Sequence, residues 1–196
     1  MLESVYGAVV GFCCRSLVKD WNTIVTIYQH GFRRAIRALQ AIGPTDRTAY
    51  YNVLVMKSDD PVAALETIQR LTEERPALYD AIARVAPAQF MFDFQSSQEF
   101  TKLAESFLLG FVPKLVGRSF HVRLHRRGSK LDLRTSEAEH VFDDFIVAAT
   151  GKLGAPARIT FAEPDAVIVI DTVDDRAGVA MWTREDLLRH RLLRPD

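Results

Sequence analysis

The stretch SFHVRLHRRG, residues 119–128, alternates apolar and basic side chains before it ends in two arginines and a glycine. Successive side chains of a β-strand point to opposite faces, so this pattern predicts a half-buried strand that runs into a turn. The apolar face carries Phe120, Val122 and Leu124. The other face carries His121, Arg123 and His125. We expect the first face to pack in a core and the second to be able to meet a polyanion.

Further basic residues follow the predicted strand within one short connection. They are Arg126, Arg127, Lys130 and Arg134. A guanidinium group can donate two parallel hydrogen bonds to a phosphate, which makes arginine suited to contacts with nucleic acid. A rigid strand with an arginine-rich turn is therefore a candidate nucleic-acid surface. The alternative is that these arginines are ordinary solvated charges at the edge of a sheet.

The composition is typical of a soluble globular chain. Of the 196 residues, 48% are hydrophobic and 26% are charged, and the formal net charge of zero excludes a uniformly basic binder. The charge is nevertheless uneven. Residues 117–134 contain six Lys or Arg against one Asp, and residues 59–80 contain six acidic residues against two arginines. Such a dipolar molecule suits a binder with one face toward a polyanion.

Cysteine and histidine spacing argues against a metal or disulfide framework. Cys13 and Cys14 are the only cysteines and are adjacent, so we expect a reducing, cytoplasmic setting. His121 and His125 would lie roughly 13 Å apart along a strand, too far to bind one ion, so no metal site is predicted. The apolar run at residues 6–14 is too short to span a bilayer and follows no basic segment, so we expect neither a signal peptide nor a membrane partner.

Periodicity and capping signals divide the chain into alternating strands and helices. Strands are predicted at residues 22–28, 49–57, 90–94, 119–125, 166–173 and 177–182. Helices are predicted at residues 31–42, from residue 60 with a second piece that continues through Val85, from residue 96 to about 113, at residues 136–151, and after Thr183. Ser136 and Glu139 are expected to form a capping box at the start of the helix at 136–151. This alternation predicts an α/β (α+β) chain with a seam at residues 96–118. We expect an extension of unclear role at residues 1–21, a small domain at 22–95, and a second domain at 96–196 that ends in a short basic tail.

The usual catalytic signatures are missing from the sequence. It has no Gly-rich phosphate loop after a strand, no G-x-S-x-G elbow and no Cys/His zinc deaminase pattern. The G-x-x-G motif at residues 151–154 is explained by the end of a helix. We therefore predict no catalytic residue and no cofactor.

Four segments in order resemble a THUMP domain, an RNA-binding module of tRNA-modifying enzymes. They are Phe120-x-Val122-Arg123-x-x-Arg126-Arg127-Gly128, Thr135-Ser136-x-x-Glu139, EPDAVIVID at 163–171 and DRAGV at 175–179. Upstream, VLVMK at 53–57, Asp60-Pro61 and RVAP at 84–87 resemble the small ferredoxin-like-related domain that precedes THUMP in many members. The resemblance covers about residues 22–183. It implies an N-terminal ferredoxin-like-related domain (22–95) packed on a C-terminal THUMP domain (96–196).

The resemblance also implies a function, because this chain ends soon after the module. Stand-alone members are non-catalytic tRNA-binding adaptors that present tRNA to an RNA cytidine acetyltransferase, which forms N4-acetylcytidine. Their RNA contacts favour the acceptor stem and the 3′-CCA end. We therefore expect a protein that is not an enzyme and that binds tRNA and an RNA cytidine acetyltransferase or another tRNA-modifying enzyme. Two alternatives stay open: a protein-interaction module without an RNA function, and a tRNA-modifying enzyme with an unrecognised site.

The basic strand carries over from the family as Arg123, Arg126 and Arg127. Three arginines of the predicted helix at residues 31–42 would extend its basic face. The candidate RNA-binding residues are Arg33, Arg34, Arg37, Arg123, His125, Arg126, Arg127, Lys130 and Arg134.

Overall fold

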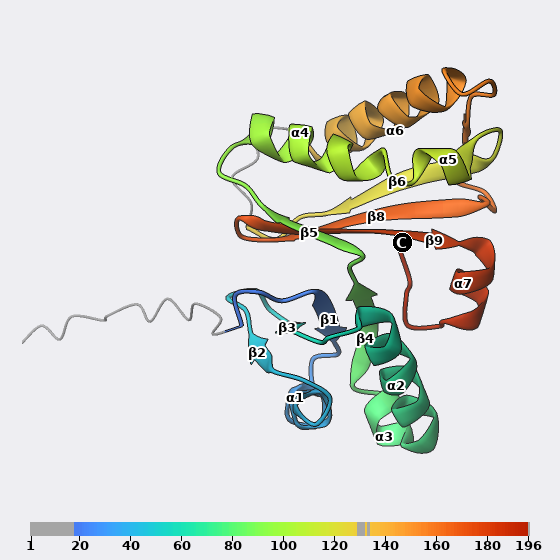
Figure 1. The fold of residues 1–196 in the computed structure, drawn as a ribbon. Coiled ribbons are helices and arrows are strands. Elements are labelled where there is room, and N and C mark those ends of the chain that lie inside the picture. The colour runs from blue at the N-terminus through green and yellow to red at the C-terminus, as the bar shows by residue number, and fades with distance from the viewer. Residues whose placement is uncertain (1–17, 129–131, 133, 196) are drawn as a thin grey trace, which may run out of the picture.

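The computed structural model describes residues 18–128, 132 and 134–195, and shows two β-sheets with helices packed on them (Figure 1). The predicted mixed α/β class is confirmed. Two of the predicted features, Lys130 and most of the 1–21 extension, lie outside the described residues. Among the residues that the structure describes, no helix has the length and apolar character needed to span a bilayer.

The first sheet has four strands in the order β2-β3-β1-β4, and every pairing in it is antiparallel. Its elements are β1 Thr23–Ile27, α1 Phe32–Gln40, β2 Thr45–Arg47, β3 Val53–Met56, α2 Pro61–Glu74, α3 Pro76–Tyr79 and β4 Ile82–Pro87. The predicted cap of α2 is present, since the Asp60 carboxylate accepts hydrogen bonds from the backbone N–H groups of Val62 and Ala63. In Figure 1 the helices α1, α2 and α3 lie on the side of this sheet that faces away from the second sheet.

The predicted helical piece through Val85 is wrong, because the chain turns after α3 and forms β4 instead. Val85 pairs with Val25 of β1, and both side chains are fully buried. Ile82 and Val85 are three residues apart, which fits the stripe of a helix as well as a short buried strand. The pairing with β1 decides between the two, because it gives the backbone of β4 its hydrogen-bond partners.

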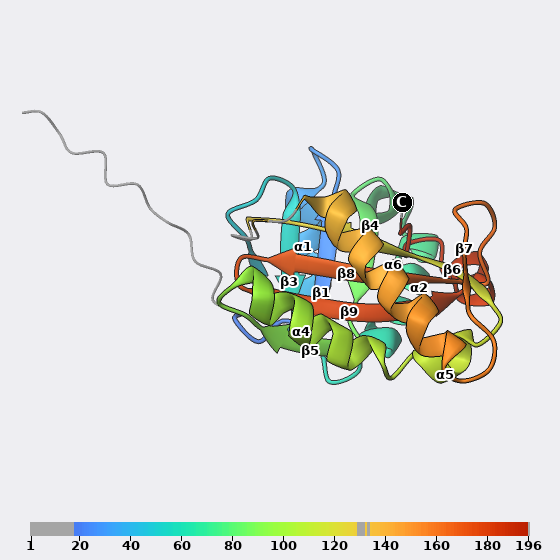
Figure 2. The same cartoon turned by 90° about the horizontal axis from the view of Figure 1, so that it is seen from above.

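The second sheet has five strands in the order β5-β9-β8-β6-β7. Its elements are β5 Phe90–Asp93, α4 Ser97–Leu108, α5 Val112–Leu115, β6 Ser119–His125, α6 Thr135–Gly151, β7 Arg158–Ile159, β8 Ala166–Val173, β9 Arg176–Thr183 and α7 Arg184–Arg189. The predicted hairpin of β8 and β9 is present, while β6 runs parallel to β8. Seen from above, α4 and α6 lie across one face of this sheet (Figure 2).

Strand β5 lies within the predicted first domain, at residues 22–95, yet pairs with β9 in the second sheet. The chain therefore enters the second sheet before the predicted boundary. A hydrophobic pattern shows that a segment is a strand, but it does not show which sheet supplies its hydrogen-bond partners. The division into two domains stays a prediction.

The second sheet is covered on both faces. Phe120, Val122 and Leu124 of β6 are buried in one core with Phe100 of α4 and Phe142 of α6, as the alternating pattern predicts. On the opposite face, Val167, Val169 and Trp182 join a second core with residues of the first unit. The first unit thus packs on the sheet through side chains of β8 and β9, and β6 lies next to this joint.

Beyond its short pairing with β7, β6 is the edge of the sheet, and two carboxylates of α6 cap this part of it. The backbone N–H of Val122 donates to Asp143 at 3.0 Å, and that of Leu124 donates to Glu139 at 2.8 Å. Glu139 was predicted to cap its own helix, but the helix begins at Thr135 and Glu137 accepts from the backbone N–H of Arg134 instead. Side chains that pair with an edge strand block the addition of a further strand. Burial raises the pKa of Asp143 to about 6 in spite of the Val122 hydrogen bond.

Candidate nucleic-acid interface

The basic face of β6 lies beside the joint between the two units rather than in open solvent. In the parallel register, His121, Arg123 and His125 stand opposite Val167, Val169 and Asp171 of β8. Residues paired in this way share a face of the sheet. His121 is buried, and Arg123 and His125 are half-buried. The fold therefore divides the predicted basic residues into some with buried partners and some toward solvent.

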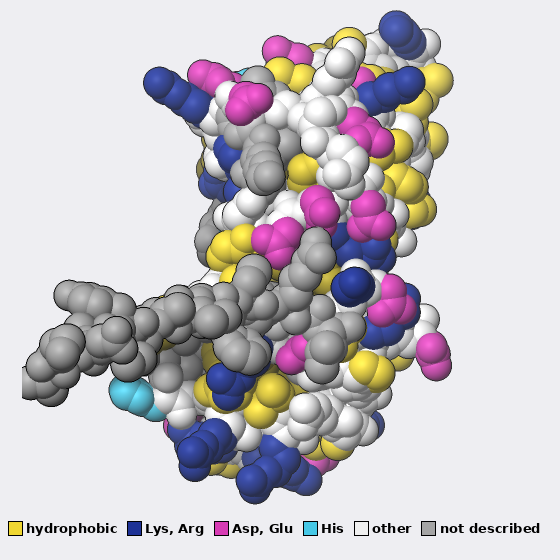
Figure 3. Space-filling model, turned by 90° about the vertical axis from the view of Figure 1, so that its left-hand side faces the viewer, with side chains coloured by type: hydrophobic (Ala, Val, Ile, Leu, Met, Phe, Trp, Pro, Cys, Tyr) yellow, Lys and Arg dark blue, Asp and Glu magenta, His cyan; other side chains and the backbone are white. Residues whose placement is uncertain are grey.

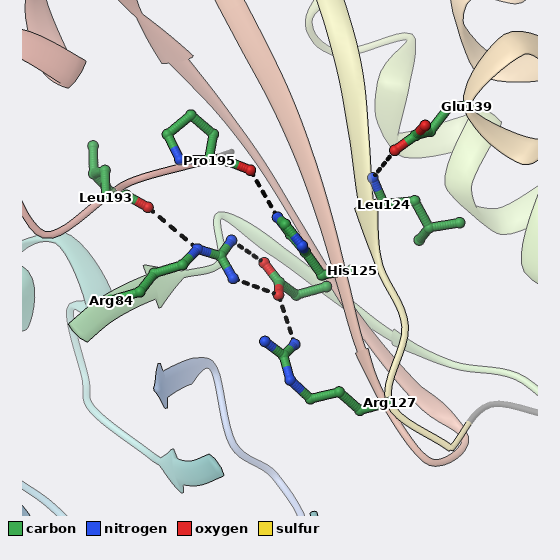
Figure 4. A network of polar contacts seen from close by, with 8 residues as sticks. Arg84, Leu124, His125, Arg127, Glu139, Leu193 and Pro195 are labelled. Atoms are coloured by element: carbon green, nitrogen blue, oxygen red, sulfur yellow. Dashed lines mark hydrogen bonds and ion pairs between the residues drawn. The ribbon is translucent and has the colours of Figure 1, made fainter. Parts of the chain in front are cut away.

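Arg127 is held by a buried ion cluster around Asp171 (Figure 4). Arg84 of β4 donates to both carboxylate oxygens of Asp171, at 3.0 and 2.8 Å, and also donates through Nε to the carbonyl of Leu193. Arg127 Nη1 lies 2.8 Å from Asp171 Oδ1, and its side chain is only 16% exposed. The cluster thus joins the first sheet, the second sheet and the C-terminal segment.

The charges of this cluster control the ionisation of its carboxylate. Burial by itself would raise the pKa of Asp171, but Arg84, His125 and Arg127 outweigh it and lower that pKa to about 2. Asp171 is therefore ionised at neutral pH and neutralises part of the charge of both arginines. Arg127 is thus paired with Asp171, and its predicted RNA contact stays a prediction.

His125 is also committed to the protein interior. Its Nε2 lies 2.8 Å from the carbonyl oxygen of Pro195 (Figure 4). Burial lowers the pKa of His125, so the neutral form is favoured at neutral pH. A neutral, half-buried imidazole is a weak partner for a phosphate. His125 therefore positions the C-terminal segment, and its predicted RNA contact has no support from this geometry.

Phe161 completes the outer end of the β6 face and was not predicted from the sequence. Its side chain is 57% exposed, its ring centroid lies 5.1 Å from that of His121, and the Arg123 guanidinium carbon lies 5.3 Å from the same ring. His121 is itself positioned by a 2.9 Å contact between Nδ1 and the carbonyl of Thr160. An exposed aromatic ring held by two neighbours is a surface on which an unpaired base can stack. The only signal in the sequence is a large aromatic residue inside the polar segment TFAEPD, residues 160–165.

The turn after β6 packs against the first unit. Gly128 has φ +67°, and an added Cβ would lie 1.4 Å from the hydroxyl of Tyr50, so only glycine fits there. The same hydroxyl donates to Asp174 at 2.5 Å. Arg126 is half-buried on this turn, and the Arg134 side chain is 86% exposed, 3.9 Å from Glu137. The anchored turn thus presents Arg126, while Arg134 stands at the N-terminus of α6.

Arg33, Arg34 and Arg37 are all exposed on α1, in the first unit, and do not continue the β6 turn. Helix α1 lies on the far side of the first sheet (Figure 1). Figure 3 shows Lys and Arg side chains over the lower part of this face, where the first unit lies, and also at its upper left edge and along its right-hand side. That these arginines extend the basic face to the same RNA stays a prediction.

Comparisons with known proteins establish the fold. No model of a known protein family matches the chain, and no curated protein matches it. It resembles PH1313 from Pyrococcus horikoshii Ot3 (TM-score 0.56, 14% identity, 82% of this chain and 54% of that one). It also resembles TrmN from Thermus thermophilus (TM-score 0.56, 13% identity, 81% of this chain and 44% of that one). A third similar structure is a 4-thiouridine synthetase solved with RNA and bound ATP (TM-score 0.51, 12% identity, 82% of this chain and 41% of that one). The chain spans about half of the length of these structures.

The expectation that the protein is not an enzyme is contradicted by these neighbours. The 4-thiouridine synthetase is named as an enzyme, and 82% of the present chain shares the fold of that protein. Missing catalytic motifs therefore do not separate this fold from enzymes, because a motif search recognises only sites of a known pattern.

Proposed function

We propose that this chain is an RNA-binding module of a tRNA-modification system and that it holds structured RNA along β6 and the turn that follows. The observation that carries the proposal is the arrangement of Phe161 against His121 and Arg123 of β6, with Arg126 directly after this strand and Arg134 at the start of α6. The likeness to a 4-thiouridine synthetase that was solved with RNA supports this choice of ligand.

The two parts of the surface have different roles in this proposal. Arginines of the turn contact phosphates, which fix the position of the RNA but carry no sequence information. Phe161 stacks on an unpaired base, which a duplex does not offer because its bases are paired and stacked on one another. An acceptor stem with its 3′-CCA end provides both features, so we propose that the acceptor end of tRNA is the part that is bound.

The bound tRNA is then available to a modifying activity. The THUMP resemblance implies a cytidine acetyltransferase as the partner, and we keep this as the first enzyme to test. A pull-down of the tagged chain with tRNA, followed by nucleoside analysis of the recovered RNA, identifies the modification.

The central experiment measures the affinity for intact tRNA and for the same tRNA without its 3′-CCA, as a function of salt. We expect Arg126→Ala with Arg134→Ala to reduce the salt slope by roughly one unit for each phosphate that the variant no longer neutralises. Phe161→Leu should lower the affinity for intact tRNA until it is close to the affinity for trimmed tRNA, because leucine keeps the apolar surface but not the ring. Arg70→Ala, an exposed arginine on α2, is the control. Unchanged slope and unchanged preference in the variants would reject this surface.

A further inference from the structure

A hollow with four arginines lies between α1 and the α2–α3 pair in the first unit. It has a volume of about 560 Å³, which lies within the usual range of small-molecule sites. Arg33, Arg34 and Arg37 line it from α1, and Arg75 lines it from the junction of α2 and α3. The remaining lining residues are leucines and alanines, among them Leu71 and Leu78.

The positive charge of this hollow has no counterpart in the described part of the chain. None of the four arginines forms an ion pair with a carboxylate among the described residues. Two acids of α2 directly precede Arg75: Glu73 is paired with Arg191 at 3.2 Å, and Glu74 forms no ion pair with these arginines among the described residues. Like charges that converge without a partner repel one another, and an anion in the hollow would remove this repulsion. The arrangement therefore favours a ligand with more than one negative charge.

The apolar part of the lining narrows the class of ligand. Apart from the arginines, no described lining residue has a side-chain hydrogen-bonding group. A flat apolar group fits against leucine and alanine side chains, while guanidinium groups take a phosphate in bidentate fashion and stack on planar rings. A lining without other polar side chains offers little to distinguish one base from another. The ligand should thus carry a phosphate and a planar group, with little selection for the identity of that group.

We propose that the hollow between α1 and α2–α3 binds a nucleoside phosphate, with the phosphate on Arg33, Arg34, Arg37 and Arg75 and the base on the apolar floor. The ligand is either a free nucleotide or one nucleotide of an RNA chain, since both present the same chemistry. The proposal uses none of the residues of the β6 turn, so it does not depend on the proposed RNA contact there.

Isothermal titration of the full chain tests the class of ligand. AMP and UMP should bind with affinities within about threefold of each other, whereas adenosine should not bind measurably. Inorganic pyrophosphate should bind at least tenfold more weakly than AMP. If pyrophosphate binds as tightly as AMP, the hollow is a plain anion site and the nucleoside part of the proposal is wrong. If neither AMP nor UMP binds, the whole proposal is wrong.

Variants link the binding to the hollow. The double variant Arg33→Ala with Arg37→Ala should lower the affinity for AMP at least tenfold. Ala77→Glu should lower it as much, because it places a carboxylate at an exposed lining position while all four arginines remain. Arg70→Ala, on the same helix as Leu71 but outside the lining, should bind AMP like the unaltered chain. Binding that survives in both hollow variants would place the ligand elsewhere and overturn the proposal.

A last comparison identifies the source of the nucleotide. If a short phosphorylated RNA binds more tightly than AMP, the hollow is assigned to RNA. This tighter binding should be abolished in Ala77→Glu and kept in the double variant Arg126→Ala with Arg134→Ala. Equal affinity of the two assigns it to free nucleotides. Both results support the proposal, and failure of tRNA binding at the β6 turn alone leaves it intact.

Discussion

Two groups of arginines in this molecule have opposite surroundings. Arg84 and Arg127 are largely buried and share one ionised carboxylate, Asp171. Arg33 and its neighbours around the α1 hollow are exposed, and the described residues offer them no ion pair. The comparison shows that the same residue type holds the two units together in one place and is available to an anion in another. Three predictions test this difference, from the largest expected effect to the smallest, and a fourth concerns a separate buried carboxylate, Asp143.

Removal of Asp171 should have the largest effect. Asp171→Ala leaves Arg84 and Arg127 buried beside each other without their carboxylate, and breaking a buried pair in this way costs about 3–5 kcal/mol. Urea unfolding followed by circular dichroism measures the loss. Asp144→Ala, an exposed acid on α6, serves as the control and should change the free energy of unfolding by less than about 0.5 kcal/mol. A loss below about 1 kcal/mol for Asp171→Ala would show that the cluster is not a structural joint.

Acid should weaken the same joint. The pKa of Asp171 is lowered to about 2 in the folded chain, so its contribution is complete above its ordinary pKa near 4 and is lost as the pH falls toward 2. A shift of this size corresponds to roughly 2 kcal/mol. Urea midpoints measured between pH 6 and pH 2 should therefore fall more steeply for the unaltered chain than for Asp171→Asn. Parallel curves would contradict the lowered pKa.

The two classes of arginine should differ in single substitutions. Arg127→Ala removes a hydrogen bond to a buried carboxylate and should destabilise the fold by about 1.5–3 kcal/mol. Arg33→Ala should change stability by less than about 0.5 kcal/mol, because the side chain is exposed and unpaired among the described residues. Thermal unfolding of both variants at one pH gives the comparison. Equal losses would remove the distinction on which the hollow is argued.

Asp143 should give a pH dependence of opposite sign to that of Asp171. Burial raises its pKa to about 6, so the folded chain favours the protonated form, and this group makes the fold less stable as the pH rises from about 4 to 6. Asp143→Asn keeps an oxygen that can accept from the Val122 N–H and removes the titration. The slope of unfolding free energy against pH should become flatter across this window in the variant. An unchanged slope would mean that Asp143 is ionised throughout.

Local patterns predicted most of the elements, and they failed where a residue's partner is distant in the chain. The alternation of residues 119–125 predicted a strand and its buried face, and the Asp60 cap predicted the start of α2. In contrast, Ile82–Pro87 has a spacing that suits a helix or a strand, and only the pairing with β1 makes it a strand. The sheet that receives β5 is likewise decided by β9, more than 80 positions farther along the chain.

The sequence by itself determined which side chains are basic, which strand faces are apolar and where the charges are concentrated, because these properties depend on residue type and short-range period. Only the tertiary structure decided which arginines are available to a ligand. Arg126 and Arg127 are neighbours in the sequence, yet Arg127 pairs with Asp171, 44 positions away, at a joint that forms only when the two sheets pack. Phe161 became a candidate contact only when the β6–β7 pairing placed it beside His121 and Arg123. Burial and long-range pairing depend on packing between distant segments, and packing is a property of the folded chain.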